Sequence, residues 1–153
     1  MVSNQHLTLR PLESADLAFV IAAWLKSFRR SPFAGVIPND LYHATYKNCF
    51  DQLLQRGMKV TVVCNKANPD QLLGFIAHET AANGTPVIHY LFVKDVFRGN
   101  GVGKLLLSDA NVKSGTSFIF TFKTSDSRKL RGGKHVPAVA RRKSLEPIYE
   151  TTT

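Results

Sequence analysis

The sequence predicts a mixed α/β (α+β) fold: an antiparallel strand meander, then a strand–helix–strand crossover, with helices flanking the sheet. Three observations lead to this prediction. Two segments with apolar residues at helical spacing precede three short segments of alternating or β-branched character. The dipeptide Asn83-Gly84, a strong hairpin turn, separates two of those strand segments. A glycine-rich turn then leads into a further helix and a last apolar strand, which implies a right-handed crossover and a parallel strand pair.

The length of 153 residues predicts one domain, residues 1–153. A membrane span is not expected, because the longest strongly apolar run, Leu17–Leu25, is far shorter than the roughly 20 residues that a bilayer requires. The start, Met1–Pro11, has no apolar signal region. Cys49 and Cys64 make neither a disulfide framework nor a metal cluster. We therefore expect a cytoplasmic protein with two reduced thiols, no metal and no membrane contact.

The first elements are a strand and a helix. Leu7–Leu12 alternates apolar and polar residues, as a short strand does. Ser14 is the predicted N-cap of the helix, with Asp16 in its first turn, where the helix dipole favours an anion. The segment 29–38 contains two prolines and a glycine and is predicted to be a loop. The apolar stripe of the helix consists of Leu17, Val20, Ile21, Trp24, Leu25 and Phe28.

A second helix is predicted to begin at Asn39 or Asp40 and to end at Gly57. Its stripe also indicates core packing, and Cys49 lies within it, so we interpret this residue as a buried thiol rather than a nucleophile. The other members of this stripe are Tyr42, Tyr46, Phe50, Leu53 and Leu54.

Three strands are predicted next, at Lys59–Cys64, Leu72–Glu79 and Pro86–Val93. The first two are joined by a turn over Asn65–Asp70, and the last two by Asn83-Gly84. Three such neighbouring strands form an antiparallel meander.

The last predicted elements are a helix from about Gly101 to Val112 and an apolar strand over Ser117–Phe122. No clear strand follows, because Lys134–Arg142 contains Pro137, which disfavours a central strand.

The net charge of +9 is concentrated near the C-terminus. Residues 1–122 hold 12 Lys or Arg and 8 Asp or Glu, whereas residues 123–153 hold 8 and 3. This divergent basic segment favours acidic or phosphate-rich partners, nucleic acid among them. A solvated tail that aids solubility is the alternative interpretation.

The segment Leu91–Leu106 contains the motif that indicates a ligand site. An apolar strand enters a turn with three alternating glycines, and a helix begins at once. The first turn of a helix has free backbone N–H groups and the positive end of the dipole, and glycines let an anion approach that backbone closely. Arg98 and Lys104 add positive charge. The pattern indicates a phosphate or pyrophosphate site.

Spacing excludes two common phosphate loops. A Walker A loop needs glycine at the position of Arg98 and Ser or Thr at the position of Leu105. A dinucleotide-binding fingerprint that begins at Gly99 needs glycine or alanine at the position of Lys104. The sequence Arg98-Gly99-Asn100-Gly101-Val102-Gly103, preceded by Leu91-Phe92-Val93, resembles the acetyl-CoA loop of the GNAT acetyltransferase superfamily. The order of elements also resembles that family through about Phe122, roughly four fifths of the chain.

The resemblance implies an N-acetyltransferase that uses acetyl-CoA. The pyrophosphate of CoA would bind the backbone amides of the glycine turn, and the pantetheine arm would run along the preceding strand. A backbone N–H near Phe92 would polarise the acetyl carbonyl, and the acceptor amine would attack the thioester directly. The implied cofactor-binding residues are Leu91, Phe92, Val93, Arg98, Gly99, Asn100, Gly101, Val102, Gly103 and Lys104.

Direct attack needs a base, because an amine such as lysine, with a pKa of about 10.4, is mostly protonated at pH 7. Many family members have a Glu four residues before the Val of Leu-x-Val, and that position is His89 here. Histidine, with a pKa near 6.5, suits this role. Glu79 is a second candidate and His78 a third. An ordinary strand residue is the alternative for each.

The chain departs from the family after Phe122, where the Tyr that often protonates the leaving thiolate has no counterpart up to Gly133. Ser125 and Ser127 are weak substitutes, and water is another. The short basic C-terminal third resembles that of compact GNAT-like proteins of tailed bacteriophages.

Two classes of function remain open. The first is transfer of an acetyl group to a primary amine: a small amine, an N-terminus or a protein lysine, with an acidic protein suited to the basic lining. The second is a catalytically weak GNAT-fold module that binds CoA and interacts with an acidic protein or a nucleic acid. The protein is expected to be a monomer or a homodimer.

Overall fold

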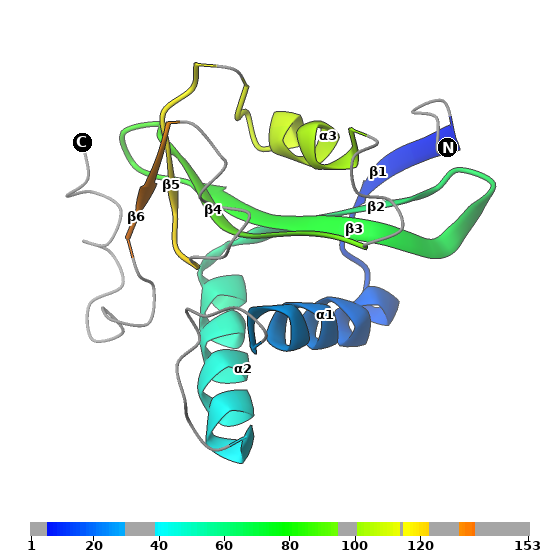
Figure 1. The fold of residues 1–153 in the computed structure, drawn as a ribbon, viewed down its shortest axis with the longest axis horizontal. Helices are drawn as coiled ribbons and strands as arrows, with labels where there is room; N and C mark the ends of the chain where they lie inside the picture. The colour runs from blue at the N-terminus through cyan, green and yellow to red at the C-terminus, as the bar shows by residue number, and fades with distance from the viewer. Residues whose placement is uncertain (1–5, 30–38, 95–100, 114, 123–131, 137–153) are drawn as a thin grey trace.

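The computed structural model describes residues 6–29, 39–94, 101–113, 115–122 and 132–136. They form a six-stranded sheet in the order β1-β2-β3-β4-β5-β6, with α3 on one face and α1 and α2 on the other (Figure 1). The elements are β1 (Leu7–Pro11), η2 (Ser14–Asp16), α1 (Leu17–Arg29), α2 (Asn39–Arg56), β2 (Lys59–Asn65), β3 (Asn68–Thr80), β4 (Pro86–Val93), α3 (Val102–Asp109), β5 (Phe118–Phe120) and β6 (Gly133–His135). This mixed α+β architecture confirms the predicted fold class.

The strand pairing confirms the meander and the crossover. Strands β1 to β4 pair antiparallel, whereas β5 pairs parallel with β4 after the passage through α3. Strand β6 was not predicted. It is three residues long, ends two residues before Pro137, and pairs parallel with β5 through Phe118 and Gly133. Three residues are too few to show a strand periodicity in the sequence. The position of β6 is set by its pairing with β5.

The β2–β3 turn is shorter than predicted. The turn consists of Lys66 and Ala67, and the sequence Asn68-Pro69-Asp70 already belongs to β3. The side-chain oxygen of Asn65 accepts the N–H of Ala67 at 2.9 Å, which closes the chain early. Proline is tolerated in β3 here because the pairing of β4 with β3 begins only at Gly74, so no β4 carbonyl needs its missing N–H.

Helix boundaries differ from the prediction at two places. The N-cap before the first helix is Glu13 rather than Ser14, and the 3-10 turn η2 precedes α1. The carboxylate of Asp16 explains the shift: it accepts the Glu13 N–H at 2.8 Å and pairs with Arg10 on β1, which also lowers the pKa of Asp16. Helix α3 ends at Asp109, before the predicted Val112, since Asn111 adopts a left-handed backbone with φ of 63°.

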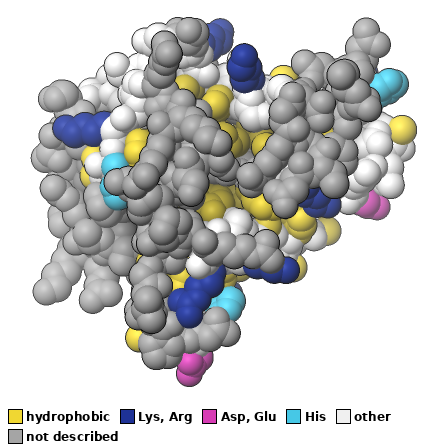
Figure 2. All heavy atoms as spheres, in the orientation of Figure 1, with side chains coloured by type: hydrophobic (Ala, Val, Ile, Leu, Met, Phe, Trp, Pro, Cys, Tyr) yellow, Lys and Arg dark blue, Asp and Glu magenta, His cyan; other side chains and the backbone are white. Residues whose placement is uncertain are grey.

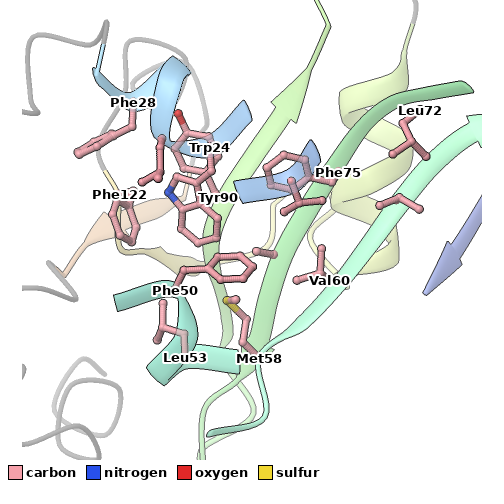
Figure 3. Packing of buried hydrophobic residues seen from close by; sticks show 14 of the residues in the cluster. Trp24, Phe28, Phe50, Leu53, Met58, Val60, Leu72, Phe75, Tyr90 and Phe122 are labelled. Carbon is pink, nitrogen blue, oxygen red and sulfur yellow. The ribbon is translucent and has the colours of Figure 1, made fainter. Parts of the chain in front are cut away.

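Two hydrophobic clusters lie on opposite faces of the sheet. The helix-pair cluster, against α1 and α2, is centred on Trp24 and confirms both predicted stripes as core packing (Figure 3). The α3 cluster includes Val102, Leu106 and Ile88. Cys49 is half-buried against the helix-pair cluster, and burial raises the pKa of its thiol to about 11, which agrees with an inert thiol.

Arg29, the first residue of the predicted loop 29–38, belongs to α1, and residues 30–38 lie outside the described residues, as does most of the basic segment 123–153. Among the described residues, no helix is long and apolar enough to cross a membrane.

Candidate active site

The start of α3 has open space beside two of its glycines. Gly101 is the N-cap of α3 and has a φ of 82°, a left-handed conformation that favours glycine. A Cβ added at Gly101 or Gly103 would meet no atom within 4 Å. Val102 is buried in the α3 cluster and anchors the turn, whereas Lys104 is exposed. An anion could therefore approach the first amides of the helix closely.

Residues Arg98, Gly99 and Asn100 of the predicted loop lie outside the described residues. Of the ten predicted cofactor-binding residues, the structure therefore places Leu91, Phe92 and Val93 at the end of β4 and Gly101 to Lys104 at the start of α3. On the face shown in Figure 2, hydrophobic side chains gather near the centre, with Lys and Arg side chains around them.

Strands β4 and β5 pair over a short stretch only. Val87 and Ile88 pair with Ile119 and Phe120, and the N–H of Thr121 donates to the carbonyl of Ile88 at 3.1 Å. Beyond Ile88, β4 continues to Val93 with no β5 partner in the described part of the chain. Within the described residues, the hydrogen bond of Thr121 is the last between the two strands, and residues 123–131, which follow Phe122, lie outside them.

A β-bulge sits where the strands part. Ala77 pairs with Tyr90 and His78 pairs with Ile88, so His89 is the extra residue on β4. In a regular strand Ile88 and Tyr90 would share one face of the sheet, but Ile88 lies in the α3 cluster and Tyr90 in the helix-pair cluster. The bulge therefore redirects the side chains of β4 at His89.

A continuous chain of side-chain hydrogen bonds passes through His89. Its Nε2 lies 2.6 Å from Oε2 of Glu79, and its Nδ1 lies 2.7 Å from Oγ1 of Thr121. Arg56, the last residue of α2, donates to the same Glu79 oxygen at 3.2 Å. These four residues, which we call the relay, come from α2, β3, β4 and the residue after β5. The structure thus brings the two predicted catalytic residues, His89 and Glu79, into direct contact.

Burial decides the charge states within the relay. The His89 side chain is 0% exposed, and this burial lowers its pKa despite the neighbouring carboxylate. Burial by itself would raise the pKa of Glu79, but the hydrogen bond and charge of His89, together with Arg56, lower it overall. Near pH 7 His89 is therefore neutral and Glu79 ionised. A carboxylate only accepts, so Nε2 of His89 carries the proton and Nδ1 accepts the Thr121 hydroxyl.

His78, the third predicted base, is not part of this arrangement. Its Nε2 lies 3.7 Å from Oδ2 of Asp109 at the end of α3, on the opposite face of the sheet. Burial lowers the pKa of His78 as well. Ser125 and Ser127, the weak substitutes for the Tyr that protonates the leaving thiolate, lie outside the described residues.

Sequence reasoning missed Thr121 and Arg56. Neither belongs to a motif, and each becomes recognisable only when the strand register is known. Thr121 lies in a stretch that the sequence presents as a plain apolar strand, and Arg56 is an ordinary basic residue in the last turn of a helix.

Because burial lowers the pKa of two histidines, we expect the stability of the folded protein to depend on pH. The unfolded state binds a proton at an ordinary histidine pKa of about 6.5, whereas burial lowers the folded-state pKa of His89 and of His78. Their contribution to stability is therefore complete above about pH 6.5 and is lost as the pH falls through the lower folded pKa. We expect Tm to decrease from pH 7 to pH 5, less steeply in His89→Gln and least in the double variant with His78→Gln. Equal slopes in all three proteins would contradict this prediction.

No cluster of three or more His, Cys, Asp or Glu side chains that could hold a metal ion occurs within the described ranges.

Comparison with known proteins supports the fold assignment through structure rather than sequence. No sequence profile of a known protein family matches the chain, and a search of curated proteins finds no match. Solved structures do match. A GCN5-related N-acetyltransferase from Ralstonia eutropha aligns with a TM-score of 0.56 and 22% identity, over 80% of this chain and 87% of its own.

Two further structures agree. A GNAT family acetyltransferase from Brucella melitensis in complex with acetyl-CoA aligns with a TM-score of 0.52 and 18% identity, over 81% of this chain and 80% of its own. A GNAT family acetyltransferase from Staphylococcus aureus aligns with a TM-score of 0.50 and 19% identity, over 68% of this chain and 63% of its own. The chain spans only 12% of a longer fungal multi-domain protein that also matches. The chain therefore has the GNAT fold, as its glycine turn and element order predict.

Proposed function

We propose that this chain, which has the GNAT fold, transfers an acetyl group from acetyl-CoA to a primary amine. The observation that carries the proposal is the start of α3, where Gly101 and Gly103 leave open space beside the helix N-terminus. A helix N-terminus bordered by two glycines suits the diphosphate of the ligand, and the preceding strand β4 suits its amide-containing arm.

The diphosphate of CoA would bind the amides of residues 98–104, and the exposed Lys104 would add a charge-assisted contact. The fit is supported by the space at Gly101 and Gly103, which a side chain would fill. The pantetheine arm would lie along Leu91–Val93 as an added strand. The acetyl carbonyl would accept a backbone N–H of this segment, near Phe92.

The transfer itself needs no covalent enzyme intermediate. The neutral acceptor amine attacks the thioester carbon, the carbon–sulfur bond breaks, and CoA leaves as a thiolate. The nitrogen, positively charged after the attack, loses a proton to give the amide, and the thiolate takes up a proton. Because an alkyl amine is protonated near pH 7, the protein must remove one proton before attack. His89 and Glu79 remain our candidates for this task, and they lie in contact with each other.

The acceptor is proposed as a class only: a small amine, an N-terminus or a protein lysine. The basic segment 123–153 favours an acidic protein as the macromolecule that presents it. A cytoplasmic location and a monomeric or homodimeric state are parts of the same proposal.

Turnover with three amines of different class tests the function. Acetyl-CoA is incubated with a peptide that has a free N-terminus, a lysine peptide with a blocked N-terminus, and spermidine. We expect amine-dependent release of the CoA thiol and an acetylated product by mass spectrometry for at least one of them. Acetyl-CoA binding without turnover would instead favour the non-catalytic CoA-binding module, and absence of both would contradict the proposal.

A further inference from the structure

His89 and Tyr90 are consecutive residues of β4, yet both side chains lie on the helix-pair face of the sheet. Tyr90 belongs to the helix-pair cluster, where its ring stacks on Trp24 with ring centroids 5.0 Å apart. His89 contacts Glu79, which also accepts a hydrogen bond from Arg56 of α2, a helix on the same face (Figure 1). Consecutive residues of a regular strand point to opposite faces. The β-bulge at His89 therefore allows both side chains to lie on this face.

The alternative position of the His89 side chain is on the α3 face. The stacking of Tyr90 keeps it opposite Ala77, so a regular ladder would place His89 opposite His78. Directly opposed residues share a face, and Ile88, the present partner of His78, belongs to the α3 cluster. On that face His89 would lose both hydrogen bonds of the relay among apolar side chains, which is unfavourable for a buried polar group. A histidine at this position thus favours the bulge over a regular ladder.

The bulge lets two parts of β4 keep different registers with β3. The first part, up to Ile88, pairs with β5. The second part, the predicted ligand segment 91–93, packs Leu91 and Val93 against the α3 cluster. Without the bulge, one part would shift by one residue against β3, and its side chains would change faces. His89 therefore fixes how the segment 91–93 lies relative to β5.

The enclosure of His89 argues against direct proton transfer from an acceptor amine. None of its side chain is exposed, and its ring nitrogens already have Glu79 and Thr121 as hydrogen-bond partners. Burial keeps the ring neutral near pH 7, with the proton on Nε2. Glu79, in contrast, is ionised and retains 15% side-chain exposure. Of the two candidate bases, only Glu79 can therefore exchange a proton with a group outside the core.

Resting on the proposed acetyl transfer, we propose that His89 is a positioning residue that fixes the bulge and holds Glu79, and that Glu79 accepts the proton of the acceptor amine. An N–H bond of the ammonium breaks and the proton passes to the Glu79 carboxylate, which leaves a neutral amine and a neutral carboxyl group. The carboxyl group then releases the proton to solvent. His89 keeps its Nε2 proton throughout and remains a hydrogen-bond donor to Glu79.

The first test compares His89→Gln with His89→Leu. Glutamine has an amide N–H that can donate to Glu79 but no group that titrates, whereas leucine can make neither hydrogen bond. Assays use acetyl-CoA and whichever of the three amines above turns over fastest. We expect His89→Gln to keep kcat within about 10-fold of the wild type and His89→Leu to lose about 100-fold or more. His43→Leu, at an exposed position of α2, is the matched control with wild-type kcat.

The pH profile separates the two candidate bases. The charged or titratable groups around Glu79 and His89 in the described chain are Arg56 from α2 and His78 from β3. His89→Gln removes only the titration of His89, so the acidic limb of the kcat–pH profile should remain, because Glu79 produces it. A limb that disappears in His89→Gln would assign the base to His89 and overturn the proposal.

A structural readout tests the positioning role without turnover. Cross-strand backbone NOEs of the ¹⁵N-labelled protein report the pair Ala77 and Tyr90 and the pair His78 and Ile88. We expect both pairs in the wild type and in His89→Gln. In His89→Leu we expect loss of the second pair, because the ladder becomes regular.

Thr121→Val replaces His89→Leu if the latter does not fold, since it keeps the shape and removes one hydrogen bond to His89. Amide hydrogen exchange in β4 around the bulge should become about 10-fold faster or more, unlike in Thr61→Val on β2. Retention of both NOE pairs in His89→Leu, unchanged exchange in Thr121→Val, or a His89→Gln protein as inactive as His89→Leu overturns the positioning role alone. A wild-type protein that acetylates none of the amines overturns the proposed function, and the NOEs then still decide whether His89 fixes the bulge.

Discussion

Replacement of Gly101 by glutamate is expected to weaken acetyl-CoA binding by at least about 100-fold, or about 2.7 kcal/mol. The added carboxylate would stand at the N-cap of α3, in space that is open around the glycine. Its charge and bulk would occupy the place proposed for the diphosphate, and its carboxylate could itself cap the helix amides. Calorimetric titration with acetyl-CoA measures the loss.

Gly115→Glu is the matched control for this variant. Gly115 has a φ of 84°, close to the 82° of Gly101, and an added Cβ there also meets nothing within 4 Å. Both substitutions therefore carry the same charge change and a similar backbone cost of about 1–2 kcal/mol for a left-handed non-glycine residue. Gly115→Glu should lose the same stability and keep its acetyl-CoA affinity. Equal affinity of both variants would contradict the proposed phosphate site.

Trp24→Ala is expected to lower the free energy of unfolding by about 3–5 kcal/mol, the usual range for a buried aromatic residue. The indole is 3% exposed and stacks on Tyr90 with ring centroids 5.0 Å apart. It also meets the edges of Phe50 and Phe122 at 5.2 Å and 5.1 Å (Figure 3). One side chain thus joins α1 to α2, to β4 and to the second residue after β5. Chemical denaturation measures the change.

The position of Trp24 also links this loss to the site. Tyr90 and Phe122 directly follow His89 and Thr121 in the sequence, so the indole holds both strands where they part. Leu41→Ala on α2 is the control, since Leu41 is 54% exposed and should cost little. A Trp24→Ala protein as stable as Leu41→Ala would contradict the assigned core.

The order of elements was predictable because the hydrophobic periodicity and the turn residues indicate the same helices and strands along most of the chain. Trp24 and Phe50 lie at core positions of their predicted stripes, and Asn83-Gly84 forms the predicted turn, with Gly84 at a φ of 87°. The predicted boundaries are wrong where a side chain hydrogen-bonds to the backbone and shifts a turn or a helix cap. Asn65 closes the β2–β3 turn early, and Asp16 shifts the N-cap to Glu13.

The candidate site was predictable only in part. The glycine turn was recognisable in the sequence because a left-handed backbone conformation and the close approach of a ligand to the backbone both favour glycine. The contact of His89 with Glu79 depends on a β-bulge, and one extra residue on β4 leaves no mark on the hydrophobic pattern. Thr121 contacts His89 through the parallel pairing of β4 with β5, at a sequence separation of 32 residues, which no local signal specifies.

The central claim is that the backbone amides at the start of α3 bind the diphosphate of CoA. The most direct test is a titration of the ¹⁵N-labelled protein with CoA, and separately with pantetheine, which lacks the diphosphate, followed by amide chemical shifts. We predict that the amides of Val102, Gly103 and Lys104 shift strongly with CoA and little with pantetheine. If CoA bound and these three amides did not move, the diphosphate would lie elsewhere and the account would be wrong.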